Sequence, residues 1–310
     1  MAKTLCPCCG SDSTTPYLSC LRDYLLPPTS ERWDIRRCTD CGIGFTFPPP
    51  KMDRIASYYP PEYVPYHVAV AERGALKTVL RKVTIAPYRL RHGDPDWVPV
   101  PTGAGRALDI GCGSGAQLRI LGEHGWRCWG IDFTADAVAA AQRNNPNANI
   151  RQCILEDYAP DVLFDLITIR HVLEHLPDPV GTLKRCHALM VDGGRIVVEV
   201  PNFESAEARL FRSRWAGWEI PRHLVHFSEA SLVRMLAHVG FSVERTRPVF
   251  FARSISESLL RCVADPFGRS IFYNRISRLA FLLLAVPASM SYLVGNRGVI
   301  EVVARRPDAP

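Results

Sequence analysis

Residues 107–115 read Ala-Leu-Asp-Ile-Gly-Cys-Gly-Ser-Gly, an apolar run that ends in glycines at three alternate positions. The run predicts a short buried strand, and the amphipathic stretch that follows it, with Leu118, Ile120 and Leu121 as apolar positions, predicts a helix. Glycines at a strand-to-helix turn let the backbone pass close to a ligand because they carry no Cβ atom. We therefore expect this segment to be one crossover of a nucleotide-binding α/β sheet.

The spacing of the glycines distinguishes between ligands. A dinucleotide site is expected to have GxGxxG, whereas this chain has GxGxG with Asp109 in the end of the strand. A carboxylate there would repel a diphosphate and suits a ligand with a cationic head. The alternative is a glycine-rich turn that binds no ligand. The strands and helices predicted after it favour the nucleotide-binding interpretation.

The stretch resembles motif I of the class I S-adenosyl-L-methionine (SAM)-dependent methyltransferases, in which an acid precedes GxGxG. This resemblance implies SAM as the cofactor and a doubly wound, seven-stranded Rossmann-like α/β sheet whose last strand is antiparallel. The residues that we expect to bind SAM are Asp109, Gly111, Cys112, Gly113, Gly115, Asp132, Phe133, Leu155, Glu156 and Arg170.

The predicted elements after the glycines follow the alternating order of strands and helices that this family implies. Residues 126–131 predict a strand ending at Asp132, which lies 17 residues beyond Gly115 and near the offset at which an acid meets ribose hydroxyls. Ile154 stands where many relatives have an acid, so we expect Glu156 or Asp157 to meet the adenine amino group. The further predicted helices are 134–143, 178–190 and 228–239, with a tight turn at 192–194, and the further predicted strands are 150–153, 164–169, 195–200, 241–247 and 299–305.

Candidate catalytic residues follow the predicted strand 164–169. The stretch 170–180 contains Val-Leu-Glu-His-Leu-Pro-Asp-Pro, which resembles a block of many small-molecule O-, N- and C-methyltransferases. Because ligands bind at the carboxyl ends of parallel strands, we expect its side chains beside the methyl donor. A later segment, 215–228, adds two tryptophans and two histidines, and resembles a segment of methyltransferases associated with bacterial surface-glycan and secondary-metabolite pathways.

Imidazole titrates near neutrality, so the histidines of both segments are candidate bases for the methyl acceptor. His171 and His223 are favoured, with Glu174 orienting a partner, although each histidine would equally suit a structural role. The full set of candidates is His171, Glu174, His175, His223 and His226.

Two CxxC pairs lie near the amino terminus, each followed by glycine. Cys6 and Cys9 are separated from Cys38 and Cys41 by 28 residues of hairpin-like sequence. Four thiols at this spacing predict a closed, structural Cys₄ zinc site, with unligated thiols as the alternative. Cys8 would be a spare thiol. The module and the glycine motif together resemble zinc-bearing sugar C-methyltransferases.

These motifs divide the chain into three parts. We expect a zinc-binding module over 1–50, a linker and helical cover over 51–102, and a SAM-dependent methyltransferase domain over 103–310 with a helical insertion at 249–296. Four tyrosines of the second part, Tyr58, Tyr59, Tyr63 and Tyr66, would line the substrate side or pack on the sheet. The absence of an apolar signal segment predicts a cytoplasmic protein.

Charge and composition suggest acceptors and partners. The net charge of +6 arises entirely after residue 200, where 15 arginines face 9 acids. Arginine suits phosphate and carboxylate, so a small-molecule or glycan-type acceptor is expected, including a nucleotide-sugar or a lipid-linked sugar. The apolar segment 279–286 with a basic flank predicts peripheral membrane contact through 269–294, or packing in a homodimer.

Two other functions compete with this one. A zinc-containing, RNA-binding methyltransferase would use the cysteine knuckles to grip RNA. Residues 1–50 carry no dense basic run with interleaved aromatics, and the chain lacks the NPPY-type motif of base-modifying enzymes, so nucleic acid is not the expected partner. A non-catalytic scaffold with this fold is a more distant alternative, because the glycine loop and both acids are intact.

Overall fold

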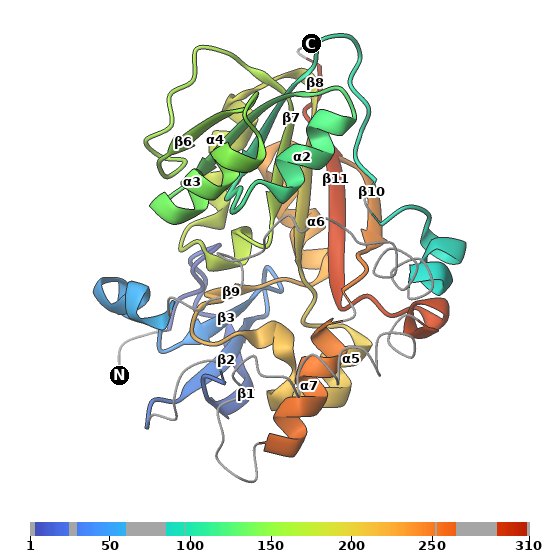
Figure 1. The fold of residues 1–310 in the computed structure, drawn as a ribbon. Helices are drawn as coiled ribbons and strands as arrows, with labels where there is room; N and C mark the ends of the chain where they lie inside the picture. Colours follow the sequence, from blue (N-terminus) through green and yellow to red (C-terminus); the bar gives the residue numbers. More distant parts are fainter. Residues whose placement is uncertain are drawn as a thin grey trace.

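The computed structural model describes residues 4–24, 30–59, 85–95, 97–251, 253–264 and 290–308. These residues form two sheets, which Figure 1 shows one above the other, with the first three strands of the smaller sheet in blue toward the bottom. The larger sheet carries the glycine motif, and the smaller sheet carries the cysteine pairs.

The larger sheet has seven strands in the order β10-β11-β8-β7-β4-β5-β6. The five strands β4 to β8 are mutually parallel, and β11 runs antiparallel between β8 and β10, which confirms the expected fold class. The strands are β4 (Arg106–Ile110), β5 (Arg127–Asp132), β6 (Asn149–Gln152), β7 (Phe164–Arg170), β8 (Met190–Pro201), β10 (Ser242–Pro248) and β11 (Val299–Arg305).

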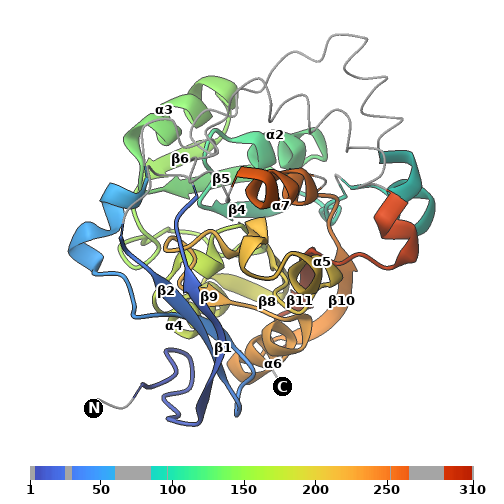
Figure 2. The same ribbon diagram turned by 90° about the horizontal axis from the view of Figure 1, so that it is seen from below.

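Helices cover both faces of this sheet. Figure 2 shows α2 and α3 on one side and α4 and α6 on the other. The central strands are apolar on both faces: Leu108 and Ile110 join the core under α4 and α6, whereas Ala107 joins the core under α2 and α3. The four helices are α2 (Ala116–Glu123), α3 (Ala135–Asn144), α4 (Pro179–Ala188) and α6 (Glu229–Val239).

The chain order places a switch point between β4 and β7. From β4 the chain runs outward through β5 and β6, and then returns to the other side of β4 as β7. Ligands of open α/β sheets bind outside the carboxyl ends of the strands at such a point. The glycine turn after β4 and the histidines after β7 lie at this edge.

One local prediction was wrong. The segment 192–194, expected to be a tight turn before a strand, lies inside β8. Its pairing with β7 shifts register between Phe164 and Leu166, and Gly193 adopts φ 73° while its N–H donates to Arg306 O at 3.0 Å. The glycine therefore accommodates a bulge in a longer strand, and the Arg306 carbonyl satisfies the backbone there.

The smaller sheet combines three strands from the first 50 residues with a strand at residues 225–226. It has the order β1-β2-β3-β9, with β1 (Thr14–Leu21), β2 (Trp33–Cys38), β3 (Gly44–Phe47) and β9 (Val225–His226), and all its pairings are antiparallel. The hairpin expected between the cysteine pairs is present. Strand β9 comes from the histidine-rich segment, so the cysteine module and the larger domain share a sheet.

The remaining described elements surround the smaller sheet or follow the larger one. They are η1 (Met52–Tyr58), η3 (Leu173–His175), α5 (Ala206–Phe211), η4 (Arg212–Arg214), η5 (Ala216–Trp218), α7 (Arg253–Ala264) and η7 (Ser291–Val294). Tyr63, Tyr66 and most of the expected membrane-contact segment lie outside the described residues. Within the described ranges, no helix has both the length and the apolar character that crossing a bilayer requires.

Candidate functional site

The turn after β4 requires glycine at each of its three glycine positions. Gly111, Gly113 and Gly115 adopt φ values of 69°, 51° and 82°, a region that side chains with a Cβ atom rarely enter. A Cβ on Gly111 would lie 2.4 Å from Cγ2 of Val172, and one on Gly115 would lie 2.2 Å from Nδ2 of Asn145. The turn is therefore compact, and its backbone lies against the neighbouring loops.

Asp132 ties this turn to the next crossover. One carboxylate oxygen accepts from Gly113 N at 3.0 Å and the other from Thr134 N at 2.9 Å. Thr134 occupies the N-cap position of α3, but its side chain makes no capping hydrogen bond. The Asp132 carboxylate thus orders the glycine turn and the start of α3 together.

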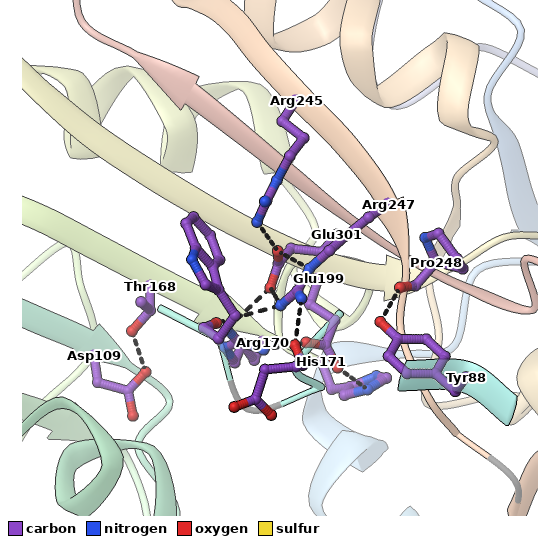
Figure 3. Close-up of polar contacts among 12 residues, drawn as sticks. Tyr88, Asp109, Thr168, Arg170, His171, Glu199, Arg245, Arg247, Pro248 and Glu301 are labelled. Atoms are coloured by element: carbon purple, nitrogen blue, oxygen red, sulfur yellow. Dashed lines mark hydrogen bonds and ion pairs between the residues drawn. The ribbon is translucent and has the colours of Figure 1, made fainter. Parts of the chain in front are cut away.

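Asp109 is buried at the end of β4. Its Oδ1 accepts a hydrogen bond from Thr168 Oγ1 at 2.6 Å, which Figure 3 shows. Burial raises the pKa of its carboxyl group to about 7, and the Thr168 hydroxyl opposes this shift by stabilising the charged form. A cation bound nearby would therefore favour ionisation of Asp109.

An apolar surface follows the carboxyl ends of β5 and β6. Phe133 is 62% exposed and Ile154 is 49% exposed, and the two strands are joined there by the bond from Cys153 N to Asp132 O. Leu155 is buried beside them, and Glu156 is exposed. Exposed Phe133 and Ile154 offer a surface for a flat apolar ring such as adenine. Ile154 departs from the family pattern and was not among the predicted cofactor contacts.

Arg170, expected at the cofactor, is held in a network of buried charges that runs across β7, β8, β11 and β10 (Figure 3). Its guanidinium pairs with Glu199 and, at 3.0 Å, with Glu301. Glu301, which is fully buried, also accepts from Arg247 Nε at 2.6 Å. Burial favours the neutral form of Glu199, but Arg170 and His171 outweigh it and bring the pKa to about 2.

His171 lies where this network meets the edge of the sheet. Its Nε2 is 3.0 Å from Glu199 Oε1 and its Nδ1 is 3.5 Å from Glu174 Oε1. The residue adopts φ 55°, its side chain is one-third exposed, and its ring lies 5.3 Å from that of Phe251. Burial disfavours the imidazolium, but the two carboxylates outweigh it and raise the pKa to about 10.

His175 and His223 form a ring pair next to Glu174, with centroids 4.6 Å apart. His175 Nδ1 lies 3.1 Å from the carbonyl oxygen of Arg222 and 3.1 Å from the hydroxyl of Tyr59. His223 Nδ1 lies 2.9 Å from Gly217 O, and burial holds the pKa of this ring well below its usual value. The two histidine-bearing segments thus meet at the carboxyl edge of the sheet, and Tyr59 joins them.

His226 lies beneath this edge, in the smaller sheet. It is buried in β9, its Nε2 is 3.1 Å from Thr46 Oγ1, and its ring lies 5.2 Å from that of Trp218. Burial lowers the pKa of this histidine to about 3. Its neighbours are therefore those of a structural side chain, while His171, His175 and His223 surround Glu174.

Arg222, one of the 15 arginines that follow residue 200, is used internally. Arg222 is 1% exposed and pairs through both terminal nitrogens with Asp23, at 2.7 and 2.8 Å. It also donates to the Tyr58 carbonyl. The side chain therefore fastens the histidine loop to the first strand hairpin and is not oriented toward a ligand phosphate.

The four predicted cysteine ligands converge. The Sγ atoms of Cys6 and Cys41 are 3.6 Å apart, as are those of Cys9 and Cys38, and all four lie within 4.8 Å of one another. Thiolates on one tetrahedral Zn²⁺, with Zn–S distances of about 2.3 Å, lie about 3.8 Å apart. The cluster therefore has the dimensions of a Cys₄ zinc site.

A depression lies at the amino-terminal end of the parallel strands of the larger sheet, away from the candidate site. It has a volume of about 400 Å³ and is lined by residues that include Trp126, Asp165 and Arg195, near the amino ends of the parallel strands. Ligands of this fold class bind at the carboxyl ends, so this depression is not the candidate site.

The chain is similar in sequence to curated methyltransferases. A ubiquinone biosynthesis O-methyltransferase of Pseudomonas aeruginosa is 32% identical over 124 residues, which are 37% of this chain and 53% of that protein. One from Coxiella burnetii is 26% identical over 199 residues, 57% of this chain and 83% of that protein. The chain thus spans about half the length of the curated relatives that match first.

Among solved structures, a methyltransferase in complex with the Haloferax volcanii Trm112 methyltransferase activator aligns with TM-score 0.49 and 19% identity. The alignment covers 73% of this chain and 91% of that one. The family described as "Methyltransferase domain" matches residues 82–246, more than half of this chain. With the glycine turn and the seven-stranded sheet in place, the chain belongs to this methyltransferase-domain family.

Proposed function

We propose that the protein is a SAM-dependent methyltransferase. The observation that carries this proposal is the arrangement at the switch point, where the glycine turn, Asp109 and Asp132 lie beside the cluster of His171, Glu174, His175 and His223. When bound, SAM supplies an electrophilic methyl group on a cationic sulfur, which an acceptor attacks in line. The residues of this chain bind and orient the two partners.

The cofactor fits the side chains at this edge. Asp109 carries a carboxyl group whose ionisation a cation would favour, and Asp132 lies at the strand end where family members meet ribose. Phe133 and Ile154 supply an exposed apolar surface for the adenine. Gly111 and Gly113 are partly exposed and carry no Cβ atom, so a nucleoside can approach the backbone of the turn there.

We propose a hydroxyl-bearing small molecule or glycan as the acceptor. The relatives named as ubiquinone biosynthesis O-methyltransferases support transfer to oxygen. The histidine cluster lies next to the expected position of the donor and supplies groups that orient an acceptor hydroxyl for attack on the methyl group. Glu199, which pairs with Arg170, also contacts His171 Nε2 and so fixes the orientation of that ring.

We further propose that the four cysteines hold a structural Zn²⁺, and that the chain is organised as a zinc-binding module over 1–50, a linker and cover over 51–102, and a catalytic domain over 103–310. The convergence of the thiols supports the metal. Four thiolates complete a tetrahedral shell and leave no position for substrate, so this zinc stabilises the fold without entering the reaction.

Calorimetric titration with SAM and S-adenosylhomocysteine tests the proposal. Wild type is expected to bind both, and D132N is expected to bind at least about tenfold more weakly, since it loses a charge at the ribose position. D136N is the matched control because Asp136 is an exposed aspartate four residues later in α3. A wild-type protein that binds neither nucleoside would overturn the proposal, as would equal effects of the two substitutions.

A further inference from the structure

Glu174 is a buried acid that accepts no hydrogen bond from the described residues and shares its neighbouring imidazolium, His171, with Glu199. It is 1% exposed, and neither of its carboxylate oxygens accepts a hydrogen bond from any residue that the structure describes. Its nearest basic neighbour is His171 Nδ1 at 3.5 Å, but that ring lies closer to Glu199, at 3.0 Å. One imidazolium shared by two buried carboxylates compensates their charge only in part, so a further cation beside Glu174 would be favourable.

The rings of His175 and His223 lie near this carboxylate, and the Nδ1 atom of each contacts a backbone carbonyl. His223 Nδ1 contacts the Gly217 carbonyl and His175 Nδ1 contacts the Arg222 carbonyl. A carbonyl oxygen only accepts hydrogen bonds, so each Nδ1 carries the proton and each Nε2 carries a lone pair. Backbone carbonyls that fix the tautomer in this way are typical of metal-binding histidines.

The distances bring these groups into one coordination shell. His223 Nε2 is 3.9 Å from Glu174 Oε1, and one ligand atom from each of Glu174, His175 and His223 lies within 4.8 Å of the others. Ligands on one zinc-sized ion, at about 2.0–2.2 Å from it, lie about 3–3.5 Å apart. A small closure of the three side chains would therefore be enough to surround an ion.

We propose that Glu174, His175 and His223 bind one divalent transition-metal ion, separate from the Cys₄ zinc. Two imidazoles and one carboxylate suit Zn²⁺, Mn²⁺ or Fe²⁺ and leave coordination positions open. The role of this ion rests on the proposed function: it binds the acceptor hydroxyl beside the methyl donor. When bound, the ion would lower the pKa of that hydroxyl, so that its proton would pass to water and the oxygen would attack the methyl group with S-adenosylhomocysteine as the leaving group.

Mn²⁺ distinguishes this site from the cysteine cluster, because oxygen and imidazole ligands suit it and thiolates favour zinc. The experiment titrates the full-length, zinc-loaded protein with Mn²⁺ and measures free Mn²⁺ by electron paramagnetic resonance. We expect one Mn²⁺ per chain in wild type, and binding weakened at least about tenfold in E174Q and in H175Q. Circular dichroism and zinc content establish that the variants are folded.

H171Q is the matched control. His171 also touches Glu174 but is not one of the three ligands, so H171Q is expected to keep Mn²⁺ binding within about threefold of wild type. Absence of a bound Mn²⁺ in the wild-type protein overturns the proposal, as does binding that E174Q leaves unchanged. Calorimetry with SAM is independent of this result, so failure of the metal site and failure of the proposed function are distinguishable.

Discussion

Thr46, in the strand that follows the second cysteine pair, donates its hydroxyl hydrogen to the carbonyl oxygen of His223 at 2.6 Å. Its backbone N–H donates to the next carbonyl, that of Leu224, at 3.0 Å. The same hydroxyl lies 3.1 Å from His226 Nε2. The backbone that presents His223 at the candidate site is therefore held by the sheet that the cysteine cluster closes.

This relationship predicts that T46V reduces methyl transfer without weakening SAM binding. The substitution keeps the shape of the side chain but leaves the His223 carbonyl without its hydroxyl donor, which costs about 1–3 kcal/mol for a buried acceptor. We expect kcat to fall about tenfold while the Kd for SAM changes less than twofold. Turnover assays and calorimetry measure the two quantities.

T46S is the control, because it retains the hydroxyl and loses only a methyl group. It is expected to keep most of the wild-type kcat. A T46V variant with wild-type kcat would show that the smaller sheet does not position the histidine loop for the reaction.

Substitution of single cysteines tests the zinc proposal within one loop. C9S is expected to lower the zinc content well below one equivalent and to reduce the melting temperature, because it removes one of four ligands. C8S changes the adjacent thiol, which is not in the cluster, and is expected to retain zinc. Elemental analysis and thermal denaturation check both, and loss of zinc in both variants to the same degree would contradict the assigned ligand set.

The raised pKa of Asp109 predicts a pH dependence of SAM binding. Burial brings this pKa to about 7 in the free protein, so the carboxyl group is mostly protonated below that pH. A bound cation favours the carboxylate, so binding below pH 7 must release a proton. Affinity is therefore expected to rise with pH, by up to about tenfold per unit, and to level off above about pH 7.

Calorimetry in buffers of different ionisation enthalpy counts the released protons directly. Because Thr168 stabilises the charged form of Asp109, T168V is expected to move the midpoint of the profile to higher pH. D109N is expected to bind weakly at every pH and to release no proton. A wild-type profile that is flat between pH 5.5 and 8.5 would contradict this account.

Some of the features behind these predictions could be predicted from the sequence, and others could not. The strands β4 and β7 and the second half of β8 were predictable because each is a short, largely apolar run that carries its own signal. The cysteine pairs likewise converge because CxxC spacing is local. The pairing of β9 with β3 was not predictable, because a two-residue strand such as Val225–His226 has no period and is defined only by its distant partner.

The buried network shows the same limit. Glu301 lies in an otherwise apolar strand, and the sequence alone does not show which groups compensate its buried charge. Its partners, Arg170 and Arg247, lie in β7 and β10, so their meeting depends on the order of strands in the sheet. The bulge at Gly193 was missed for a related reason, since Asp-Gly-Gly is typical of turns and only the register against β7 shows otherwise.

Gly111 offers a test of the turn itself. G111A is expected to destabilise the protein by about 1–3 kcal/mol and to weaken SAM binding, because the residue has positive φ and the new methyl group would meet Val172 at 2.4 Å. G122A is the matched control, because Gly122 lies within helix α2 with nothing within 4 Å of its added Cβ. It is expected to stabilise the protein by about 0.5–1 kcal/mol, and equal destabilisation by both substitutions would contradict the role of the turn.

Glu301 is expected to be the most sensitive single charge in the larger sheet. E301Q removes the charge between Arg170 and Arg247 and leaves two buried guanidinium groups in mutual repulsion, so we expect a loss of about 3–5 kcal/mol in the free energy of unfolding. E244Q breaks the exposed pair with Arg195 on the same sheet and is expected to cost less than about 1 kcal/mol. Denaturant unfolding of the two variants measures the difference. If E301Q proved no more costly than E244Q, the buried network would contribute nothing to the stability of the sheet, and the orientation of His171 would need another cause.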